Sequence, residues 1–494
     1  MGGAEPVKRA GLGIRFLGDP DEIRIPFFVA HRHRPVSIPS GTGSNQGTRG
    51  RSGNVTATAT AKPKRAGRPI GYLPKDRPAW PAMLTLGLQH VLTMFPATVL
   101  VAILTGFDVG VTLFASGLAT VVALVGSGMK IPLYYGSSFS YIAAVAAVVG
   151  AEWGGIRVAQ GGIVATAFVS VAAGLLIRRV GKDALDRVLP PVITGSVAIV
   201  IGISLAKTAL DQASANWLVS TFTLLVTIML SVYLRKSGFL SMIPVLLGAV
   251  AGYLLAMVLG EVSFEAVRQA SWVRVPAFTT PVFRWSAVLA IAPIAIATIP
   301  ESTAHLYQIS LYIDNLADEL GRERLQIKNM IGLNLILDGI GDAVNGLLGG
   351  CAGTNYGENN SLMAITRNYS VPVLITAGAI AMGLGFLGKL AAIVETLPLA
   401  VTGGLAIFLF GVIGLQGVAL MQSEKVDLFD PRQLGIGAVI LIIGIGGSMF
   451  EGGAIPIMIP GLEVAFPGGL PAIATAAVVG ILLNLVFLLI PPKA

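Results

Sequence analysis

The chain has 494 residues, of which 54% are hydrophobic and only 12% are charged. Soluble domains carry about 25% charged residues, so this composition excludes an ordinary soluble enzyme. Apolar runs long enough to cross ~30 Å of hydrocarbon recur from about residue 84 to residue 490. They predict an all-α polytopic membrane protein. The single cysteine, Cys351, excludes an intramolecular disulfide and a thiolate metal cluster.

Residues 1–77 hold 14 Lys and Arg residues against five acidic ones, whereas the remainder of the chain is close to neutral. The net charge of +8 therefore belongs to this leader, which is rich in Gly, Ser, Thr, Arg and Pro. Such a composition buries too little apolar surface to fold, so we expect a disordered tail or an over-long predicted start. A basic stretch before a first span favours the cytoplasmic side of the membrane.

About fourteen spans are predicted after the leader, near residues 84–104, 109–127, 131–149, 160–178, 191–210, 216–234, 240–259, 286–306, 329–345, 350–366, 371–391, 397–420, 434–450 and 470–490. Loops on the side of the N-terminus carry 13 Lys and Arg residues and loops on the other side carry six. This asymmetry predicts a cell-membrane protein with both termini in the cytoplasm. The outer loop at 261–285 separates two halves, 78–260 and 286–494, of seven spans each. Because seven is odd, the halves must insert in opposite orientations, as in an inverted repeat.

The third span of each half is interrupted by a Tyr-Gly pair, in IPLYYGSSFS at 131–140 and in GGCAGTNYGE at 349–358. Non-helical backbone is tolerated at membrane depth only where it is buried in protein or lines a cavity. Matching interruptions in two halves indicate a substrate site near the membrane centre. A helix that restarts after each break would point its free N–H groups into that site.

Two glutamates, Glu301 and Glu358, each lie in an apolar, Gly- and Pro-interrupted stretch, within IPESTAHLYQ and TNYGENNSLMAITR respectively. A carboxylate at bilayer depth costs roughly 2.5–3.5 kcal/mol on insertion scales, so we interpret the pair as ligand-binding groups. Of the four histidines, only His90 and His305 belong to the membrane part. By contrast, Asp338, Asp342 and Asn345 sit in a Gly-rich connection, LDGIGDAVNGLLGG, where we expect them to cap helices or to face water.

Four segments together resemble a known family: LGLQHVLTMFPATVLVAILTG, YYGSSFSYIAA, PESTAH and NYGENNSLMAITR. The chain resembles the nucleobase–ascorbate (nucleobase:cation symporter-2) transporters, and most closely their bacterial uracil/xanthine permease branch, from about residue 75 to the C-terminus. The resemblance implies fourteen spans in a seven-plus-seven inverted repeat, with short antiparallel strands in spans 3 and 10. Spans 1–4 and 8–11 would form a core domain, and spans 5–7 and 12–14 a gate domain that mediates a homodimer.

The resemblance also implies roles for seven residues. The carboxylates would accept hydrogen bonds from ring N–H groups, backbone amides would donate to an exocyclic oxygen, and other side chains would wall the pocket or organise the carboxylates. These are Glu301 and Glu358, the amides of Phe139 and Gly357, the walls Ala97 and Tyr356, and the organising His305. The carboxylates and histidines, His90 included, are also candidates for carrying a proton, because ionisable groups placed close together couple their titrations.

The expected function is therefore import of uracil by proton symport with alternating access. No cofactor, metal or nucleic acid is expected, and the partners are a small nucleobase and the lipid bilayer. Glu358, where purine-selective relatives have glutamine, favours uracil, because an ionised carboxylate can only accept hydrogen bonds. Departures from the family pattern at Pro96, Ala102 and Asn360–Ser361 leave the exact base open.

Several alternatives stay open at this point. Xanthine, uric acid or another purine is the main one, and ascorbate or an inorganic anion could use the same fold. Anion carriers are expected to lack paired carboxylates. A membrane-embedded enzyme that uses Glu301 and His305 as an acid–base pair is remote, because no nucleophile motif or metal-ligand set accompanies them. A channel or a non-transporting sensor is equally remote.

Overall fold

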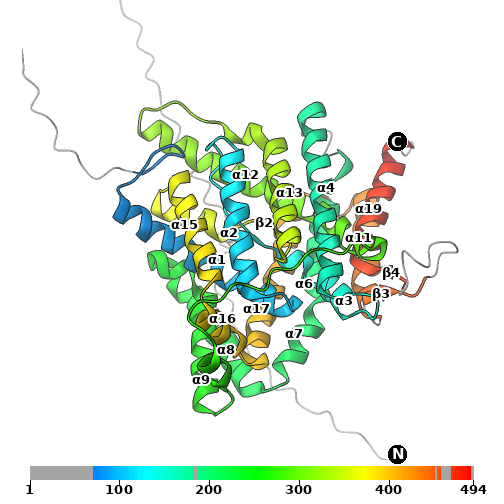
Figure 1. The fold of residues 1–494 in the computed structure, drawn as a ribbon. Helices are drawn as coiled ribbons and strands as arrows, with labels where there is room; N and C mark the ends of the chain where they lie inside the picture. Colours follow the sequence, from blue (N-terminus) through cyan, green and yellow to red (C-terminus); the bar gives the residue numbers. More distant parts are fainter. Residues whose placement is uncertain (1–70, 182–186, 451–452, 458–468, 491–494) are drawn as a thin grey trace, which may run out of the picture. The chain divides into compact units, whose positions relative to one another are not determined.

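The computed structural model describes residues 71–181, 187–450, 453–457 and 469–490 (Figure 1). Within these residues, nine helices are long and apolar enough to cross a membrane, and four shorter apolar helices accompany them. The protein is therefore a mostly helical polytopic membrane protein, as its composition predicts. Residues 1–70, which make up most of the predicted leader, lie outside the described part.

The first half of the described chain contains nine α-helices and one strand, joined by short 3₁₀ turns. In chain order these are α1 (Trp80–Thr105), α2 (Val109–Gly126), β1 (Tyr135–Ser137), η1 (Phe139–Tyr141), α3 (Ile142–Gly150), α4 (Ile156–Val180), α6 (Pro191–Ser204), α7 (Ala206–Ala213), α8 (Trp217–Tyr233), η2 (Leu234–Lys236), η3 (Gly238–Met242), α9 (Pro244–Val258) and α10 (Glu265–Gln269).

In the second half a short strand again follows two long helices, and two further short strands lie near its described end. It consists of α11 (Trp285–Ile291), η4 (Ala292–Ile294), α12 (Ala295–Glu319), η5 (Ile327–Met330), α13 (Ile331–Leu348), β2 (Gly353–Asn355), α14 (Gly357–Thr366), α15 (Val371–Gly385), α16 (Gly388–Glu395), α17 (Leu399–Ser423), α18 (Pro431–Leu441), the π-helical turn η6 (Ile442–Gly446), the strands β3 (Ala454–Ile455) and β4 (Leu470–Pro471), and α19 (Ala472–Leu489).

Two elements of the second half differ from the sequence-based prediction. The span expected to end near residue 306 continues as α12 to Glu319. Its last turns carry polar and charged residues, among them Asn315 and Asp318, on an exposed stripe. The apolar run in the sequence therefore ends before the helix does. The short helix α16 was predicted as the end of the preceding span, but a break at Phe386–Leu387 separates it from α15.

The helices pack in two groups. In the first group, α4 packs along α13, while α2 and α1 pack along α15. In the second group, α17 packs against α6, α7 and α8, and α18 packs against α19. Figure 1 shows α2, α13 and α4 next to one another around β2, with α8 and α9 together away from them. The crossing strands therefore lie among the helices of the first group.

Glycines face each other where helices of the first group cross. At the α2–α15 crossing, a Cβ on Gly117 would come 2.5 Å from the carbonyl oxygen of Gly378, and one on Gly378 would come 2.8 Å from that of Gly117. At the α4–α13 crossing, Gly174 and Gly332 have the same reciprocal relation, at 2.6 Å each way. Small residues let backbones approach this closely within a membrane. These crossings therefore hold helices from the two halves of the chain in direct backbone contact.

The two interrupted segments pair with each other, as the family resemblance implies. β1 and β2 are antiparallel, with Tyr135 opposite Asn355, Gly136 opposite Thr354 and Ser137 opposite Gly353. The backbone pairing continues on both sides of the strands, from Tyr356 N to Tyr134 O at 2.9 Å and from Ser138 N to Ala352 O at 3.0 Å. All of these residues are buried, so the polar backbone at this depth is satisfied by the opposite strand.

Residues 71–77, the end of the predicted leader, pack against the second half of the chain. Tyr72 N donates to Arg367 O at 3.0 Å, and Tyr369 N donates to Tyr72 O at 2.9 Å. Asp76 accepts two hydrogen bonds from the Arg322 guanidinium, at 2.7 and 2.8 Å. The packed part of the described chain therefore begins before the first helix.

Candidate functional site

Each strand of the central pair leads directly into the first turn of a helix. After β1, Ser138 precedes η1, which begins at Phe139, and after β2, Tyr356 precedes α14, which begins at Gly357. The first N–H groups of a helix have no partner within it and carry a partial positive charge. The predicted restarts are thus present, and the antiparallel pairing brings both helix starts to the same small region.

Glu301 and Glu358 are exposed, although the residues around them in sequence are buried. Glu301 lies in α12 beside buried Ser302 and Thr303, and Glu358 lies in the first turn of α14 beside buried Asn359. Glu301 lies one turn before His305, and Glu358 directly follows Gly357, the residue against which the His305 ring lies. The two acceptors therefore lie on different helices next to the contact between His305 and Gly357, and packed protein encloses neither of them.

His305 lies one turn after Glu301 and links α12 to the strand pair. Its Nδ1 is 2.8 Å from the carbonyl oxygen of Asn355 in β2. A carbonyl oxygen only accepts, so Nδ1 carries the proton and Nε2 of the neutral ring is free to accept. A Cβ on Gly357 would come 2.7 Å from that Nε2. The imidazole therefore lies directly against the first residue of α14, beside the glutamate pair.

The predicted pocket walls also come from elements next to the strands. Tyr356 is buried, and its hydroxyl bonds Thr98 Oγ1 of α1 at 2.9 Å and donates to Ser137 O of β1 at 2.8 Å. Ala97, the residue before Thr98, is half-buried in α1. The Phe139 ring meets the Phe410 ring of α17 edge to face, with centroids 6.4 Å apart. Phe139 therefore forms a contact between the two helix groups.

His90 ties helices together instead of joining the glutamates. It is 1% exposed, and Asn359 Nδ2 donates to its Nδ1 at 3.0 Å and to its carbonyl oxygen at 3.2 Å. The imidazole thus holds α1 against α14 from the side of Asn359. Its neighbour in α14, Asn360, donates to His305 O at 3.2 Å, so α14 is fastened to both histidine-bearing helices.

The expectation for Asp338, Asp342 and Asn345 is corrected by the structure. All three are buried in α13 rather than in a loop or facing water. Asp338 Oδ2 accepts from the Ser302 hydroxyl and from Asn355 Nδ2, and Asp342 Oδ1 accepts from the Tyr135 hydroxyl. Glycines 339, 341 and 346 lie within this helix. Because they carry no side chains, neighbouring segments can approach the helix closely there. A buried polar network therefore lies behind the glutamate pair, and the sequence pattern alone did not identify it.

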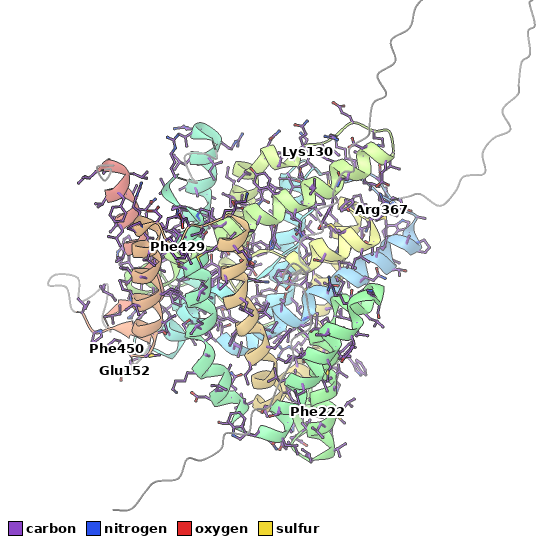
Figure 2. All side chains as sticks on the ribbon, turned by 180° about the vertical axis from the view of Figure 1, so that it is seen from behind. Lys130, Glu152, Phe222, Arg367, Phe429 and Phe450 are labelled. Atoms are coloured by element: carbon purple, nitrogen blue, oxygen red, sulfur yellow. The ribbon has the colours of Figure 1, made fainter. Side chains whose placement is uncertain are left out.

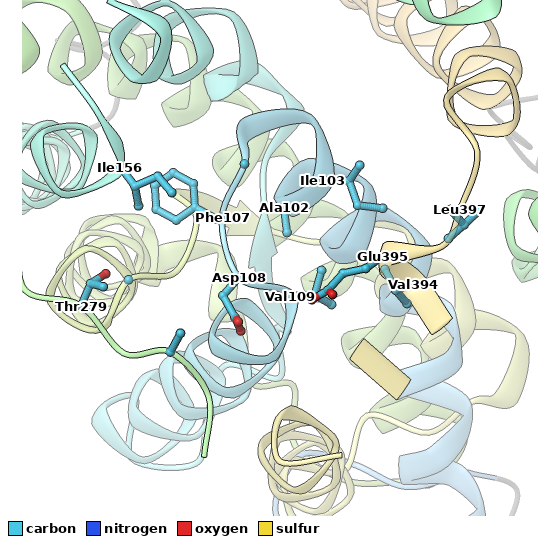
Figure 3. A pocket seen from close by; sticks show the side chains of 13 residues that line it. Ala102, Ile103, Phe107, Asp108, Val109, Ile156, Thr279, Val394, Glu395 and Leu397 are labelled. Carbon is cyan, nitrogen blue, oxygen red and sulfur yellow. The ribbon is translucent and has the colours of Figure 1, made fainter. Parts of the chain in front are cut away.

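A cavity of about 510 Å³ lies elsewhere, and neither glutamate of the pair lines it (Figure 3). Its wall includes Phe107, Asp108 and Glu395. Asp108 caps α2 by accepting from Val111 N at 2.8 Å. Arg274, from the loop between the halves, donates to Asp108 Oδ2 at 2.8 Å and lies 3.8 Å from Glu395 Oε1. This cavity is thus bounded by an ion-pair network and not by the strand pair.

No group of three or more His, Cys, Asp or Glu side chains gathers as metal ligands do within the described ranges. What the site offers instead is two carboxylates, one free imidazole nitrogen and two helix starts around the strand pair. Two broken membrane helices that meet in this way are the arrangement of a membrane transport protein.

The model of the permease family, the xanthine/uracil permeases, matches residues 81–452. The chain belongs to this family, that of the nucleobase–ascorbate transporters, so the family predicted from the four motifs is confirmed. It is a permease and not an enzyme.

Two relatives align with this chain over most of their own length. The uracil permease of Bacillus caldolyticus is 37% identical over 427 residues, which cover 83% of this chain and 93% of the relative. The uracil permease of Escherichia coli K12 is 34% identical over 435 residues, which cover 86% and 95%. Among solved structures, murine Slc26a9, an anion transporter in its inward-facing state, aligns with a TM-score of 0.57 at 12% identity over 89% of this chain and 74% of that chain. That likeness concerns the fold alone.

Proposed function

We propose that this protein imports uracil by proton symport and alternating access, with no further cofactor. The observation that carries the proposal is the exposed pair Glu301 and Glu358, set among buried residues beside the two helix starts. The names of the uracil permeases at 34–37% identity support uracil as the base. The site supplies both kinds of hydrogen-bonding group that such a base requires.

Uracil is a flat ring with two N–H donors and two carbonyl acceptors. In the proposed complex, Glu301 and Glu358 accept from the ring N–H groups, and the amides of Phe139 and Gly357 donate to a carbonyl oxygen. Ala97 and Tyr356 wall the ring. A site built to hydrogen-bond a ligand's polar edge rejects analogues that lack it, because its own buried groups are then left unpaired.

The proposed coupling proton is carried by the group formed by Glu301, Glu358 and His305. Nδ1 of His305 is engaged by Asn355 O at 2.8 Å, so only Nε2 can take up a proton, on the side of Gly357. In this proposal, one proton held within the group would reduce the repulsion between the two carboxylates when the base is absent. His90 is engaged by Asn359 and is the weaker candidate.

We further propose fourteen membrane segments in two inverted halves of seven. Numbering the segments in each half, α4 and α15 are the fourth of their halves, and α2 and α13 are the second. The packing of α4 on α13 therefore has its counterpart in α15 on α2, and that of α8 on α9 in α18 on α19. The crossing of α6 with α17 is its own counterpart. Exchanging each helix for its counterpart in the other half therefore gives the same set of helix contacts, as expected for two halves related by a two-fold pseudo-symmetry axis.

The proposed core domain comprises spans 1–4 and 8–11, which are α1 to α4 and α11 to α15 with the strand pair, and the proposed gate domain comprises α6 to α9 and α17 to α19. Figure 2 shows Lys130 and Arg367 toward one end of the molecule and Glu152 and Phe450 toward the other. We assign the Lys130 end to the cytoplasm, because basic residues prefer that side of the cell membrane. Both termini would then be cytoplasmic, and the gate domain would form a homodimer.

Transport of radiolabelled uracil by the full-length chain in proteoliposomes tests the function. We expect counterflow uptake that an inward-directed proton gradient accelerates, with competition by unlabelled uracil stronger than by xanthine, uric acid or thymine. Glu301→Gln and Glu358→Gln should each lower uptake about 10- to 100-fold, because hydrogen bonds to charged groups contribute about 1.5–3 kcal/mol.

The matched control is Glu319→Gln, which removes a glutamate that pairs with Arg367 at the end of α12 and should leave uptake near wild type. Uptake that is independent of the proton gradient, with Glu301→Gln fully active, contradicts proton coupling. Stronger competition by xanthine than by uracil would replace uracil with a purine.

A further inference from the structure

Asp342 bonds both strands of the central pair through one carboxylate oxygen. The Tyr135 hydroxyl of β1 donates to Asp342 Oδ1 at 2.6 Å, and the backbone N–H of Gly353 in β2 donates to the same oxygen at 2.9 Å. Asp342 is 1% exposed and lies in α13, which contributes no other bond to Tyr135 among the described contacts. A buried carboxylate is retained at this depth only where donors satisfy it.

The surroundings of Tyr135 are shaped to bring its hydroxyl to this carboxylate. A Cβ on Gly341 would come 2.5 Å from the Tyr135 ring, so the ring crosses α13 at a residue without a side chain. A Cβ on Gly353 would come 2.1 Å from the carbonyl oxygen of Gly136. The phenol and the Gly353 amide therefore reach Asp342 only because two glycines leave the space free.

The backbone of β1 is also fixed from the other side, by α2. Ser116 and Thr120, one turn apart, donate to Tyr135 O at 2.7 and 3.1 Å, and Tyr135 N donates to Thr120 Oγ1 at 3.1 Å. On α13, Asp338 and Asp342 are likewise one turn apart, and Asp338 holds the Asn355 side chain of β2. Asp342 differs from Ser116, Thr120 and Asp338 because it bonds β1 and β2 together.

We propose that Asp342 is a positioning residue of the transport site, and this inference rests on the proposed function of that site. By holding Tyr135 and Gly353 on one oxygen, it fixes the register of β1 on β2. The strands continue into Phe139 and Gly357, so their register sets the separation of the two amides that receive the base. Binding sites must be held to within about 0.5 Å by their supporting residues. Asp342 acts here as a hydrogen-bond acceptor, and its negative charge is not required.

Two substitutions separate the acceptor from the charge. Asp342→Asn keeps a carbonyl oxygen that can accept both hydrogen bonds, whereas Asp342→Leu has nearly the same size and no acceptor. In the purified full-length protein, we expect Asp342→Asn to bind uracil within about 3-fold of wild type. Asp342→Leu should weaken uracil binding by about 10-fold or more, the size expected when buried donors lose their partner. Tyr135→Phe, which removes one of the two bonds, should fall between them.

A second measurement reports on the strands without any ligand. Hydrogen–deuterium exchange followed by mass spectrometry should show faster exchange in the peptide containing Gly353 for Asp342→Leu, and unchanged exchange for Asp342→Asn. Asp430→Leu is the matched control: Asp430 also accepts from a backbone amide, that of Arg432 at 3.1 Å, but lies at the start of α18. It should alter neither uracil binding nor exchange at Gly353.

Three results would overturn the inference. They are an Asp342→Leu protein that binds like wild type, an Asp342→Asn protein that is as weak as Asp342→Leu, and unchanged exchange at Gly353 in Asp342→Leu. Failure of the wild-type protein to bind uracil would instead contradict the proposed function, and the exchange measurement would still test the strand contact. If Asp342→Leu does not fold, Tyr135→Phe provides both readouts with a smaller change.

Discussion

At Gly357, the lack of a side chain decides where the imidazole of His305 lies. A Cβ there would come 2.7 Å from Nε2, closer than real Cβ atoms approach a ring nitrogen. The imidazole cannot retreat freely, because its Nδ1 is bound to Asn355 O. Gly357 therefore serves the site twice, with its amide at the start of α14 and with the space that it leaves for His305.

Replacement of Gly357 by Ala should lower uracil uptake by about 10-fold or more, because small displacements of positioned groups cost on the order of 10- to 100-fold in activity. Uptake in proteoliposomes with equal amounts of protein is the measurement. Gly383→Ala is the control, since a Cβ at Gly383 in α15 meets no atom within 4 Å. Equal uptake by the Gly357→Ala variant and wild type would show that His305 does not need its present position.

Residue patterns predicted part of the site and missed another part. Glu301 and Glu358 could be identified because an acidic residue in an apolar run is unusual and costly. Asp342 could not, because its Gly-rich surroundings resemble a loop in sequence. Its partners Tyr135 and Gly353 become neighbours only after folding, and Tyr135 is 207 residues away. The sequence alone thus reveals a charged residue whose place in an apolar run is energetically costly. It does not reveal a residue whose hydrogen-bond partners lie far away in the chain.

Among the elements, the helix pairs that cross at glycines are the most constrained. Gly117 on α2 and Gly378 on α15 are each in contact with the backbone of the other helix. A methyl group there must separate the helices, which lie beside the strand pair. The stability of the α2–α15 crossing therefore depends on two positions that carry no side chain.

We expect Gly117→Ala to destabilise the protein by about 1–3 kcal/mol, the usual cost of overpacking a well-packed contact. A thermal-unfolding measurement in detergent should show a lower Tm. Gly411→Ala in α17 should not lower it, because a Cβ at Gly411 meets no atom within 4 Å. If the two variants unfold at the same temperature as wild type, α2 and α15 have room to separate without cost.

The elements differ in how well sequence predicts them. Long apolar helices such as α1, α4 and α17 follow from composition, because an unbroken apolar run of about 20 residues crosses the bilayer as a helix. The two Tyr-Gly breaks predict non-helical backbone and restarting helices, and the family resemblance implies the pairing of the strands. The end of α12 at Glu319 and the separation of α16 from α15 do not follow from the sequence, because polar turns outside the hydrocarbon and short reorienting breaks leave no apolar signal.

On the scale of the whole molecule, the charge distribution gives a testable orientation. Lys130 and Glu152 are both exposed and lie toward opposite ends (Figure 2). In a Cys351→Ser background, a cysteine at Glu152 should react with a membrane-impermeant maleimide on intact cells. A cysteine at Lys130 should react only after the membrane is permeabilised.

The native Cys351 is 3% exposed, so unsubstituted protein should label weakly in both conditions and provides the background. Labelling of the Lys130 position in intact cells, with protection of the Glu152 position, would reverse the proposed orientation. Labelling of both positions in intact cells would exclude a barrier between them and would contradict the proposed number of segments.

The pairing of β1 with β2 has a consequence for how the protein is made. Thr98 bonds Tyr356 across 258 residues of chain, and Tyr135 bonds Asp342 across 207. Contacts this distant in sequence form late, because a long loop must close before they are gained. During synthesis, β1 therefore emerges and inserts well before its partner exists. Until the second half is made, the backbone groups of β1 lack the partners that satisfy them in the folded protein.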